Sequence, residues 1–385
     1  MSKKIIEVKI GEPKLWLNSR GDSWETCWAE DDYLYTVADD TRGFGDLSTD
    51  RKRQGSNLAL NVFRGSSLDD VQGETINHML DYGEQNAIVP EGCSDGCCWK
   101  AMGITSVDGV LYMSVGRHDY GWSSEDFINR QTAQNASIIK STDKGKTWTR
   151  PADINYQNPM FKGGKFGTPY FIHYGKAGQE TVHNSDKYVY AVSNNGYWDN
   201  GDAMKLGRVL RSKIGELNAA DWEYYIGGDG MDDAAWSKNI IDINLAGYMT
   251  NGPGQGHILF APGKCSMTGA CYIEGLERYV MIQWYYTSGA GQNFVGSKSL
   301  GLPEPGHETV WDFYESPYPW GPWTKFHSHT WNPTGMYNPC IIPKFCSSDG
   351  SKIAIFTNGD FHTAEKEGAD CTARLMTLEC ELFLQ

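Results

Sequence analysis

A short pattern recurs along the chain as EDDYLYTVADD (30–40), VDGVLYMSVGRHD (107–119), SDKYVYAVSNNG (185–196), GLERYVMIQWYY (275–286) and SDGSKIAIFTNGD (348–360). Each copy begins with a turn, continues as a short apolar and aromatic strand, and ends in a cluster of polar or aromatic residues. The first three intervals between copies are 77, 78 and 91 residues, measured between Leu34, Leu111, Val189 and Val280. Such repetition is typical of a β-propeller, in which small antiparallel sheets called blades surround an axis.

A second, alternating strand follows several copies of this pattern, as NLALNVFRG (57–65), NASIIKSTD (135–143), LGRVLRSKIG (206–215) and ARLMTLECEL (373–382). We interpret the two strands as neighbours within one antiparallel blade. Seven blades of about 55 residues would account for the 385 residues, and five or six blades are the alternatives. The last alternating strand can close the ring beside KKIIEVKIG (3–11), which removes exposed strand edges. Because the sequence has no Pro- or Ser-rich linker, we expect one domain over residues 1–385.

The composition also favours an all-β fold. Glycine accounts for 44 residues and aromatic residues for 13% of the chain, whereas only 21% of the residues are charged. Aromatic residues suit pleated sheets, and glycines suit the tight turns between strands. A length of 385 residues exceeds what one compact core usually supports, which agrees with a fold that repeats small cores. The sequence therefore predicts an all-β, seven-bladed β-propeller.

The net charge of −14 argues against a broad basic surface, and so against a nucleic acid or an anionic membrane as partner. No apolar run reaches the roughly 18 to 20 residues of a membrane span. The start MSKKIIEV lacks the apolar region of a secretory signal, so we expect a cytoplasmic protein, with secretion after removal of a signal as the alternative. We expect a monomer.

The chain has ten cysteines. Cys265 and Cys271 are six residues apart, as are Cys340 and Cys346, and three more cysteines lie in EGCSDGCC (91–98). Neither arrangement has the Cys-x-x-Cys or Cys/His spacing of a zinc site. Disulfides, buried free thiols and a metal site remain as alternatives.

Residues 141–148, STDKGKTW, form the motif S-x-D-x-G-x-T-W. The motif resembles the Asp box of sialidases and other β-propellers. The Asp carboxylate can accept N–H groups of the turn, Gly145 supplies a positive φ, and Trp148 fills the space between strands. In the propellers that it resembles, the box lies on the outer rim, so we expect Asp143 and Trp148 to be structural.

Several longer segments resemble carbohydrate-active β-propellers. They are GDSWETCWAEDDYLYTVADDT (21–41), GKFGTPYFIHYGK (164–176), YIEGLERYVMIQWYY (272–286), ESPYPWGPWTKF (315–326) and YNPCIIPKFCSSDGSKIAIF (337–356). One similar family comprises seven-bladed propellers that act on rhamnose linked to glucuronic acid in plant arabinogalactan, and it contains rhamnosidases and lyases. The other is the domain-of-unknown-function propeller family that includes endo-D-arabinanases. Since we can place no arginine triad with a Tyr/Glu pair, we do not expect a sialidase.

The repeated strands start at equivalent turns, so their last residues should meet on one face of the ring around the central channel. These residues are Asp39 and Asp40; Arg117, His118 and Asp119; Asn194 and Asn195; Trp284, Tyr285 and Tyr286; Asn358 and Asp360. Five strands thus bring carboxylate, guanidinium, imidazole, amide and aromatic groups to one rim. This selection favours a sugar-binding pocket over ordinary solvated turns, and we expect an oligo- or polysaccharide as partner.

A uronate lyase is the first of three functional hypotheses. Such an enzyme needs a base for the proton next to the substrate carboxylate, a cation or amide that neutralises this carboxylate, and an acid for the leaving oxygen. The candidates are His118 as the base, Arg117, Lys100 or Lys165 as the cation, and Tyr285 or Tyr337 as the acid. In the lyase-containing family, histidines and arginines on one face have these roles, and His118 resembles one of them.

A glycoside hydrolase is the second hypothesis, and it requires two carboxylates. Asp22 and Asp40 resemble the carboxylate pair of the arabinanase group, and Glu315 is a spare candidate. The third hypothesis is a non-catalytic sugar-binding propeller. Further substrate-binding candidates are Asn194, His257, Trp284 and Asn338. The cofactor that we consider is calcium, held by Asp and Asn oxygens of the central channel.

Overall fold

The computed structural model describes residues 4–16, 18–45, 55–84, 95–120, 131–199, 201–228, 230–240, 264–287, 308–331, 335–359 and 374–385. These residues form a nearly all-β structure, as the composition predicts. The helices among them are single turns, such as α1 (Arg211–Ile214). None of them is long and apolar enough to cross a membrane.

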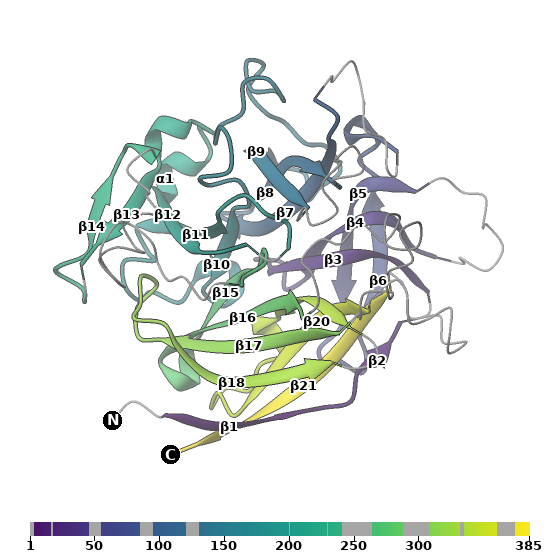
Figure 1. The fold of residues 1–385 in the computed structure, drawn as a ribbon. Coiled ribbons are helices and arrows are strands. Elements are labelled where there is room, and N and C mark those ends of the chain that lie inside the picture. Colours follow the sequence, from purple (N-terminus) through teal and green to yellow (C-terminus); the bar gives the residue numbers. More distant parts are fainter. Residues whose placement is uncertain are drawn as a thin grey trace, which may run out of the picture.

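The described strands group into five antiparallel units, which we call blades 1 to 5 and which follow one another around a common centre (Figure 1). Blade 1 consists of β3 (Ser19–Trp28), β4 (Leu34–Phe44), β5 (Ser56–Arg64) and β6 (Gln72–Asn77). Blade 2 consists of β7 (Cys98–Val107), β8 (Val110–Asp119) and β9 (Thr132–Ser141). Blade 3 consists of β10 (Tyr170–His173), β11 (Tyr188–Asn194), β12 (Met204–Leu210), β13 (Glu223–Gly227) and β14 (Ala235–Ser237).

The remaining strands form blades 4 and 5. Blade 4 consists of β15 (Ala270–Ile273), β16 (Arg278–Tyr286), β17 (Thr309–Ser316) and β18 (Thr324–Trp331). Blade 5 consists of β19 (Met336–Ile341), β20 (Lys352–Gly359) and β21 (Leu375–Leu384), joined by β1 (Ile5–Ile10) and β2 (Lys14–Leu15). Blades 3 and 4 share one sheet through the parallel pair β10 and β15.

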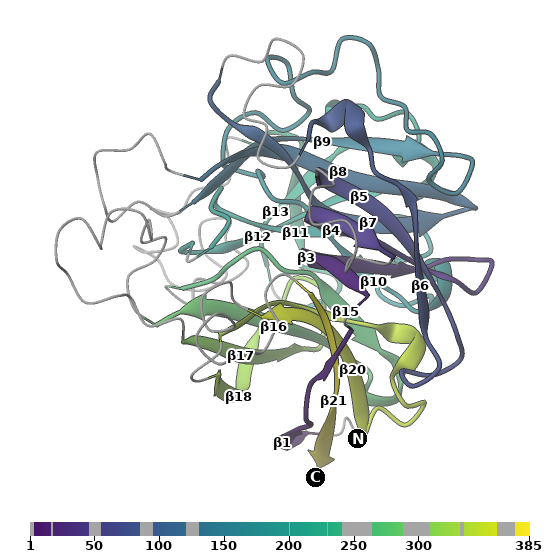
Figure 2. The ribbon, with the colours of Figure 1, turned by 90° about the vertical axis from the view of Figure 1, so that its right-hand side faces the viewer.

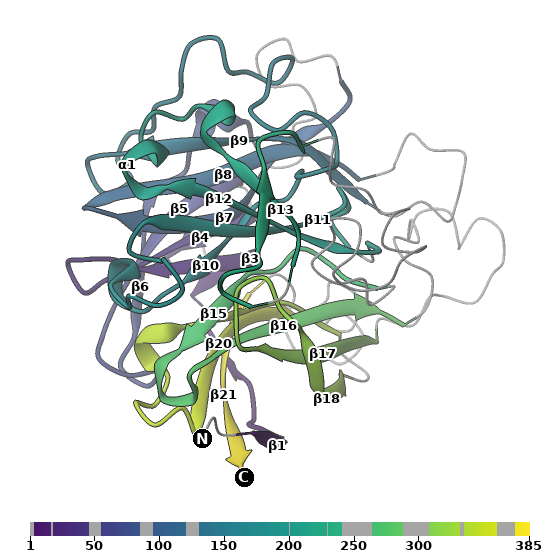
Figure 3. The same cartoon turned by 90° about the vertical axis from the view of Figure 1, so that its left-hand side faces the viewer.

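The first strand of each blade faces the axis. β3 contacts both β7 and β19, β7 contacts β10, and β10 pairs with β15. Side views show these strands as neighbours from blade to blade (Figures 2 and 3). Residues on the first and second strands therefore lie closest to the centre of the ring.

The ring is closed by strands from both ends of the chain, as the sequence predicts. β1 pairs antiparallel with β21, with Val8 opposite Leu382 and Ile10 opposite Cys380. The two termini consequently lie close together (Figure 1). The pairing covers an edge of blade 5 that would otherwise expose unpaired backbone groups.

The number of blades among the described residues is five, which corresponds to the alternative prediction and not to the favoured seven. Each copy of the repeated pattern forms the second strand of one blade, namely β4, β8, β11, β16 and β20. The alternating segments form the third strands β5, β9, β12 and β21. Successive copies are 73 to 91 residues apart, measured to Ile353 for the last copy, so the interval between described blades is longer than the 55 residues of the division.

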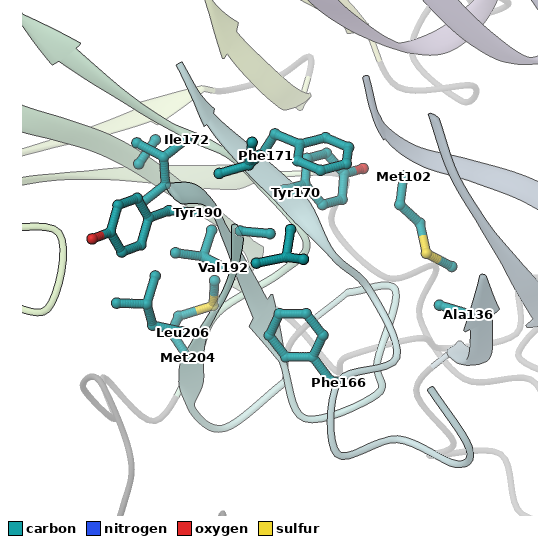
Figure 4. Packing of buried hydrophobic residues seen from close by; sticks show 14 of the residues in the cluster. Met102, Ala136, Phe166, Tyr170, Phe171, Ile172, Tyr190, Val192, Met204 and Leu206 are labelled. Atoms are coloured by element: carbon teal, nitrogen blue, oxygen red, sulfur yellow. The ribbon is translucent and has the colours of Figure 1, made fainter. Parts of the chain in front are cut away.

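Apolar and aromatic side chains fill the spaces between blades. The largest cluster extends from blade 2 through blade 3 to blade 4, and Figure 4 shows part of it. There Phe166 packs against Trp222 and Phe161, with ring centroids 5.9 and 5.3 Å apart. Three smaller clusters hold blade 4 to blade 5, blade 1 to blade 2, and blade 5 to blade 1. The excess of aromatic residues in the sequence therefore serves packing between blades.

The turn after β9 contains the hydrogen bonds that the residues of the STDKGKTW motif predict. The Asp143 carboxylate accepts from the Thr147 N–H at 2.9 Å, and the Ser141 hydroxyl accepts from the Gly145 N–H at 2.7 Å. Gly145 has a φ of 87°, where a Cβ would collide with Leu60 of blade 1. The turn thus fits closely against the neighbouring blade.

The cysteines that the structure describes are all free thiols. These eight residues are Cys27, Cys97, Cys98, Cys265, Cys271, Cys340, Cys346 and Cys380. Cys93 and Cys371 lie outside the described residues. Within the described ranges, neither Cys265 and Cys271 nor Cys340 and Cys346 are joined by a disulfide, so the disulfide alternative does not hold for these residues.

Candidate functional site

Three aspartates meet where β3 begins and β4 ends. The two strands are antiparallel, and Asp22 of β3 lies opposite Asp39 of β4, which precedes Asp40. The pairing is irregular on both sides of Asp22. The residues after it, Ser23 and Trp24, have φ values of 71° and 31°, and Asp40 has 41°. Left-handed backbone at several non-glycine residues is costly and is concentrated at functional sites.

Asp40 is held by groups of blade 2. The Lys100 ammonium on β7 lies 2.5 Å from its Oδ1, and the Tyr120 hydroxyl donates to its Oδ2 at 2.8 Å. Burial opposes the charge of Lys100, but Asp40, with smaller contributions from Cys98, Asp39 and Asp22, outweighs this effect, and the pKa of Lys100 lies above its usual value. The ion pair therefore keeps Asp40 in a cationic environment.

Asp22 has a different environment. The Tyr337 hydroxyl on β19 donates to its Oδ2 at 2.9 Å, whereas its buried Oδ1 has no hydrogen-bond partner in the described part of the chain. Burial, and next the neighbouring Asp40, raise the pKa of Asp22 to about 7, against the opposing influence of Lys100. Asp22 can thus hold a proton near neutral pH while Asp40 is paired with a cation.

Amide side chains of blade 5 hold the irregular segment of β3. The Asn338 amide donates to the Ser23 hydroxyl at 2.8 Å, and the Ser23 N–H donates to the Asn358 side chain at 3.0 Å. Asp39 accepts from the Ala101 N–H at 3.0 Å, and its burial raises its pKa well above the usual value. Three blades therefore position the cluster formed by Asp22, Asp39, Asp40, Lys100, Tyr120 and Tyr337, which we call the carboxylate cluster.

His118, the predicted lyase base, is buried beside this cluster. Its Nε2 lies 2.9 Å from the Gln131 side chain, and its ring packs edge-on against Tyr120 and Trp198. Burial, and next Lys100, lower the pKa of His118 to about 3. Its ring is therefore neutral at physiological pH and weakly basic.

Arg117, the predicted partner of a substrate carboxylate, is occupied. Its Nε and one terminal nitrogen donate to the two oxygens of Asp95 at 2.9 and 2.7 Å. The guanidinium also lies 4.6 Å above the Trp99 ring. Because side chains alternate along a strand, Arg117 and its neighbour His118 point to opposite sides of β8.

Two further candidates have structural contacts. The Asn194 side chain accepts from the N–H groups of Gly196 and Tyr197 and so stabilises the turn after β11. The Trp284 indole donates to the Met267 carbonyl at 3.1 Å, and the ring packs against Tyr337 at 5.5 Å. Trp284 is thus placed to fix the tyrosine that contacts Asp22.

The other predicted residues are not brought to the carboxylate cluster by any described contact. Tyr285 is half-buried on β16, with Lys264 at 5.3 Å from its ring. Lys165 accepts a hydrogen bond at its carbonyl from Lys205. Glu315 lies 3.9 Å from Arg278. His257 lies outside the described residues.

The sequence analysis missed Tyr120, and it listed Asp39 only among the residues at the strand ends. Tyr120 directly follows the strand end Arg117-His118-Asp119, so its position in the chain was a usable signal.

For the calcium hypothesis, the described ranges contain no group of three or more His, Cys, Asp or Glu side chains arranged as ligands. The cation that the structure places among the aspartates is the Lys100 ammonium.

No family model and no curated protein matches the sequence. A putative hydrolase from Bacteroides ovatus ATCC 8483 is similar in structure, with 15% identity, a TM-score of 0.50, and coverage of 94% of this chain and 85% of that chain. A protein of unknown function from Dyadobacter fermentans DSM 18053 has 8% identity and a TM-score of 0.49, over 98% and 99% of the two chains. An α-L-arabinanase of Cellvibrio cellulosa has 11% identity and a TM-score of 0.47, over 93% and 91%. At 15% identity, the similarity to the Bacteroides ovatus protein supports the fold alone.

Proposed function

We propose that this chain is a carbohydrate-active enzyme, a glycoside hydrolase with Asp22 and Asp40 as its catalytic carboxylates. The observation that carries the proposal is the unequal environment of the two groups. Burial and Asp40 raise the pKa of Asp22 to about 7, whereas Lys100 and Tyr120 hold Asp40. Glycoside hydrolysis requires one protonated and one ionised carboxyl group at the same site.

The two aspartates take complementary roles in this mechanism. Asp22 gives its proton to the glycosidic oxygen as the bond between this oxygen and the anomeric carbon breaks. Asp40 either accepts a proton from the attacking water or attacks the anomeric carbon itself. The anomeric configuration of the first product, measured by NMR, distinguishes these two courses.

Two observations make the lyase a weaker proposal. The guanidinium of Arg117 is paired with Asp95, so it is not free to neutralise a substrate carboxylate. The low pKa of His118, caused first by burial, makes this ring a poor base for removing a carbon-bound proton. Hydrolysis by the carboxylate cluster requires neither an unpaired Arg117 guanidinium nor a basic His118 ring.

The test is an assay on three polysaccharides, arabinan, xylan and arabinogalactan. New reducing ends without ultraviolet absorbance of an unsaturated uronate indicate hydrolysis. We expect Asp22→Asn and Asp40→Asn each to lower kcat/KM by about 10²–10⁴-fold. The matched control is Asp31→Asn, at the other end of the same hairpin, which should change kcat/KM less than twofold.

Three results would count against this assignment. Unsaturated product that disappears in His118→Gln would favour the lyase. Sugar binding without any product would favour a non-catalytic propeller. Full hydrolysis by Asp22→Asn would remove this residue from the mechanism.

The pH dependence provides a further prediction. Because Asp22 must be protonated and its pKa is raised to about 7, chiefly by burial, kcat/KM should fall as the pH rises through about 7. A pH–rate profile of the wild-type protein measures this limb. An activity that stays constant up to pH about 9 would contradict the role of Asp22 as the acid.

A further inference from the structure

An open groove lies between blades 1 and 2, lined by residues that have no part in the carboxylate cluster. Its volume is about 850 Å³, within the range of ligand sites. One wall runs from β6 to the turn at Tyr82, and the other is the Asp-box turn and the residues that follow it, from Lys146 to Arg150. Asn77 joins the two walls, since its amide donates to the Lys146 carbonyl at 2.9 Å.

The groove combines aromatic surface with positive charge. The Trp148 ring lines one wall, and Arg150 lies 5.9 Å above the Tyr82 ring on the other. Lys146 and Arg150 are exposed, and neither forms an ion pair with a described residue. Asp81 is the one carboxylate among the described lining residues.

These cations stand out against the charge of the whole protein. The chain carries a net charge of −14, whereas the described lining of the groove has two cations, Lys146 and Arg150, and one carboxylate, Asp81. A flat aromatic ring suits a sugar ring, and an unpaired guanidinium or ammonium suits a carboxylate. The wall composition therefore matches an acidic sugar chain better than a neutral or cationic ligand.

We propose that this groove is a second glycan-binding site, which holds a uronate-bearing stretch of the polysaccharide away from the carboxylate cluster. The inference rests on the proposed function, because it assumes that the protein acts on polysaccharide. A sugar ring would lie against Trp148, and its carboxylate would contact Lys146 and Arg150. Such a site would increase the affinity for polymer and leave the turnover of short substrates unchanged.

The test measures binding of a uronate-bearing oligosaccharide to the full chain by calorimetry, in an Asp22→Asn background that prevents turnover. Lys146→Gln combined with Arg150→Gln should weaken binding at least about tenfold. The matched control replaces Lys162 and Lys187 by glutamine. These lysines are exposed and lie outside the groove, so this control removes the same charge.

A second variant works in the opposite direction. Asp81→Asn removes the acidic group of the groove and should tighten binding of the acidic oligosaccharide about two- to threefold. Asp81 is exposed, so folding should not depend on it. A neutral arabinan oligosaccharide should show neither effect.

Several outcomes would overturn the proposal. Equal losses in the groove variant and its control would mean unspecific attraction, and tighter binding of poly-glutamate than of the oligosaccharide would mean a peptide site. Unchanged affinity in both groove variants would exclude the site. Since binding and hydrolysis are measured separately, intact binding with no hydrolysis by the wild type would contradict the proposed function and leave the groove in place.

Discussion

Each end of the β3–β4 hairpin carries three acidic residues, but the surroundings of these residues differ between the two ends. In the turn, Glu30 accepts from the Ser106 hydroxyl at 2.6 Å and from the Gly109 N–H at 2.7 Å. Asp32 lies 3.2 Å from each of Lys344 and Lys176. These acids thus connect blade 1 to blades 2, 3 and 5, through contacts that remain partly in water.

At the opposite end, Asp22, Asp39 and Asp40 are buried, and Lys100 is the cation nearest to them in the described structure. One oxygen of Asp22 and one of Asp39 have no hydrogen-bond partner among described residues. Exposed and paired acids cost little, whereas buried acids that share a cation destabilise the folded state. One end of the hairpin therefore maintains the fold, whereas the other buries carboxylates at the expense of stability, as the proposed hydrolase requires.

Removal of the cation at each end gives the largest expected difference. Lys100→Met leaves the buried carboxylates without their ion pair, and we expect the free energy of unfolding at pH 7 to fall by about 3–5 kcal/mol. Lys344→Met removes a cation whose partner Asp32 is half exposed, and should cost about 1 kcal/mol or less. Guanidinium denaturation measures both values.

The loss in Lys100→Met should also depend on pH. Without Lys100 the buried carboxyl groups retain protons more readily, so their charge repulsion is relieved in acid. The destabilisation should therefore be smaller at pH 5 than at pH 8. Equal destabilisation by Lys100→Met and Lys344→Met would refute the contrast between the two ends.

The sequence predicted the architecture through its repeat. The five copies of the pattern correspond to five second strands, and the order of strands within each blade followed from the alternating segments. The count of seven came from the average blade length, whereas the described residues form five blades. The length of the connections depends on no periodic signal, so the copies themselves were the better guide.

The site was predicted in part. Asp22, Asp40, Lys100 and Tyr337 were all candidates, and the structure brings them together. Their relative roles could not be predicted, because these depend on burial and on contacts between blades 1, 2 and 5. His118 and Arg117 were given too much weight, since a strand-end position does not reveal that Asp95 already pairs with the arginine.

The protonation of Asp22 predicts a measurable effect on stability. Its pKa is raised from 3.8 to about 7, first by burial and then by Asp40, so between these pH values the folded state binds a proton that the unfolded state has released. Stability contributed by this group is present below pH about 4 and lost as the pH rises through about 7. Asp22→Asn abolishes this dependence, so its free energy of unfolding relative to the wild type should be higher at pH 8 than at pH 4 by about 4 kcal/mol.

Thermal unfolding of both proteins across this pH range provides the measurement. Asp31→Asn is the control, because the turn acid lies in water and its contacts are with Tyr35 and Lys144. A difference between Asp22→Asn and the wild type that stays constant with pH would show that Asp22 is ionised throughout.

The smallest expected effect is that of Asp32→Asn in the turn. Burial opposes the charge, but hydrogen bonds from Lys344, Trp28 and Lys176 together lower the pKa of Asp32 below 3.8, so its stabilising contribution is present at neutral pH and is lost in acid. Since Asp32 is half exposed, the substitution should lower the free energy of unfolding at pH 7 by about 0.5–1 kcal/mol, and by less at pH 3. Denaturation at 0.05 and 1 M salt sharpens the result, because screening should remove most of the effect of a solvated ion pair. A loss in free energy of unfolding above about 3 kcal/mol that persists in high salt would mean that Asp32 behaves like a buried ion pair. The two ends of the hairpin would then not differ in the way described.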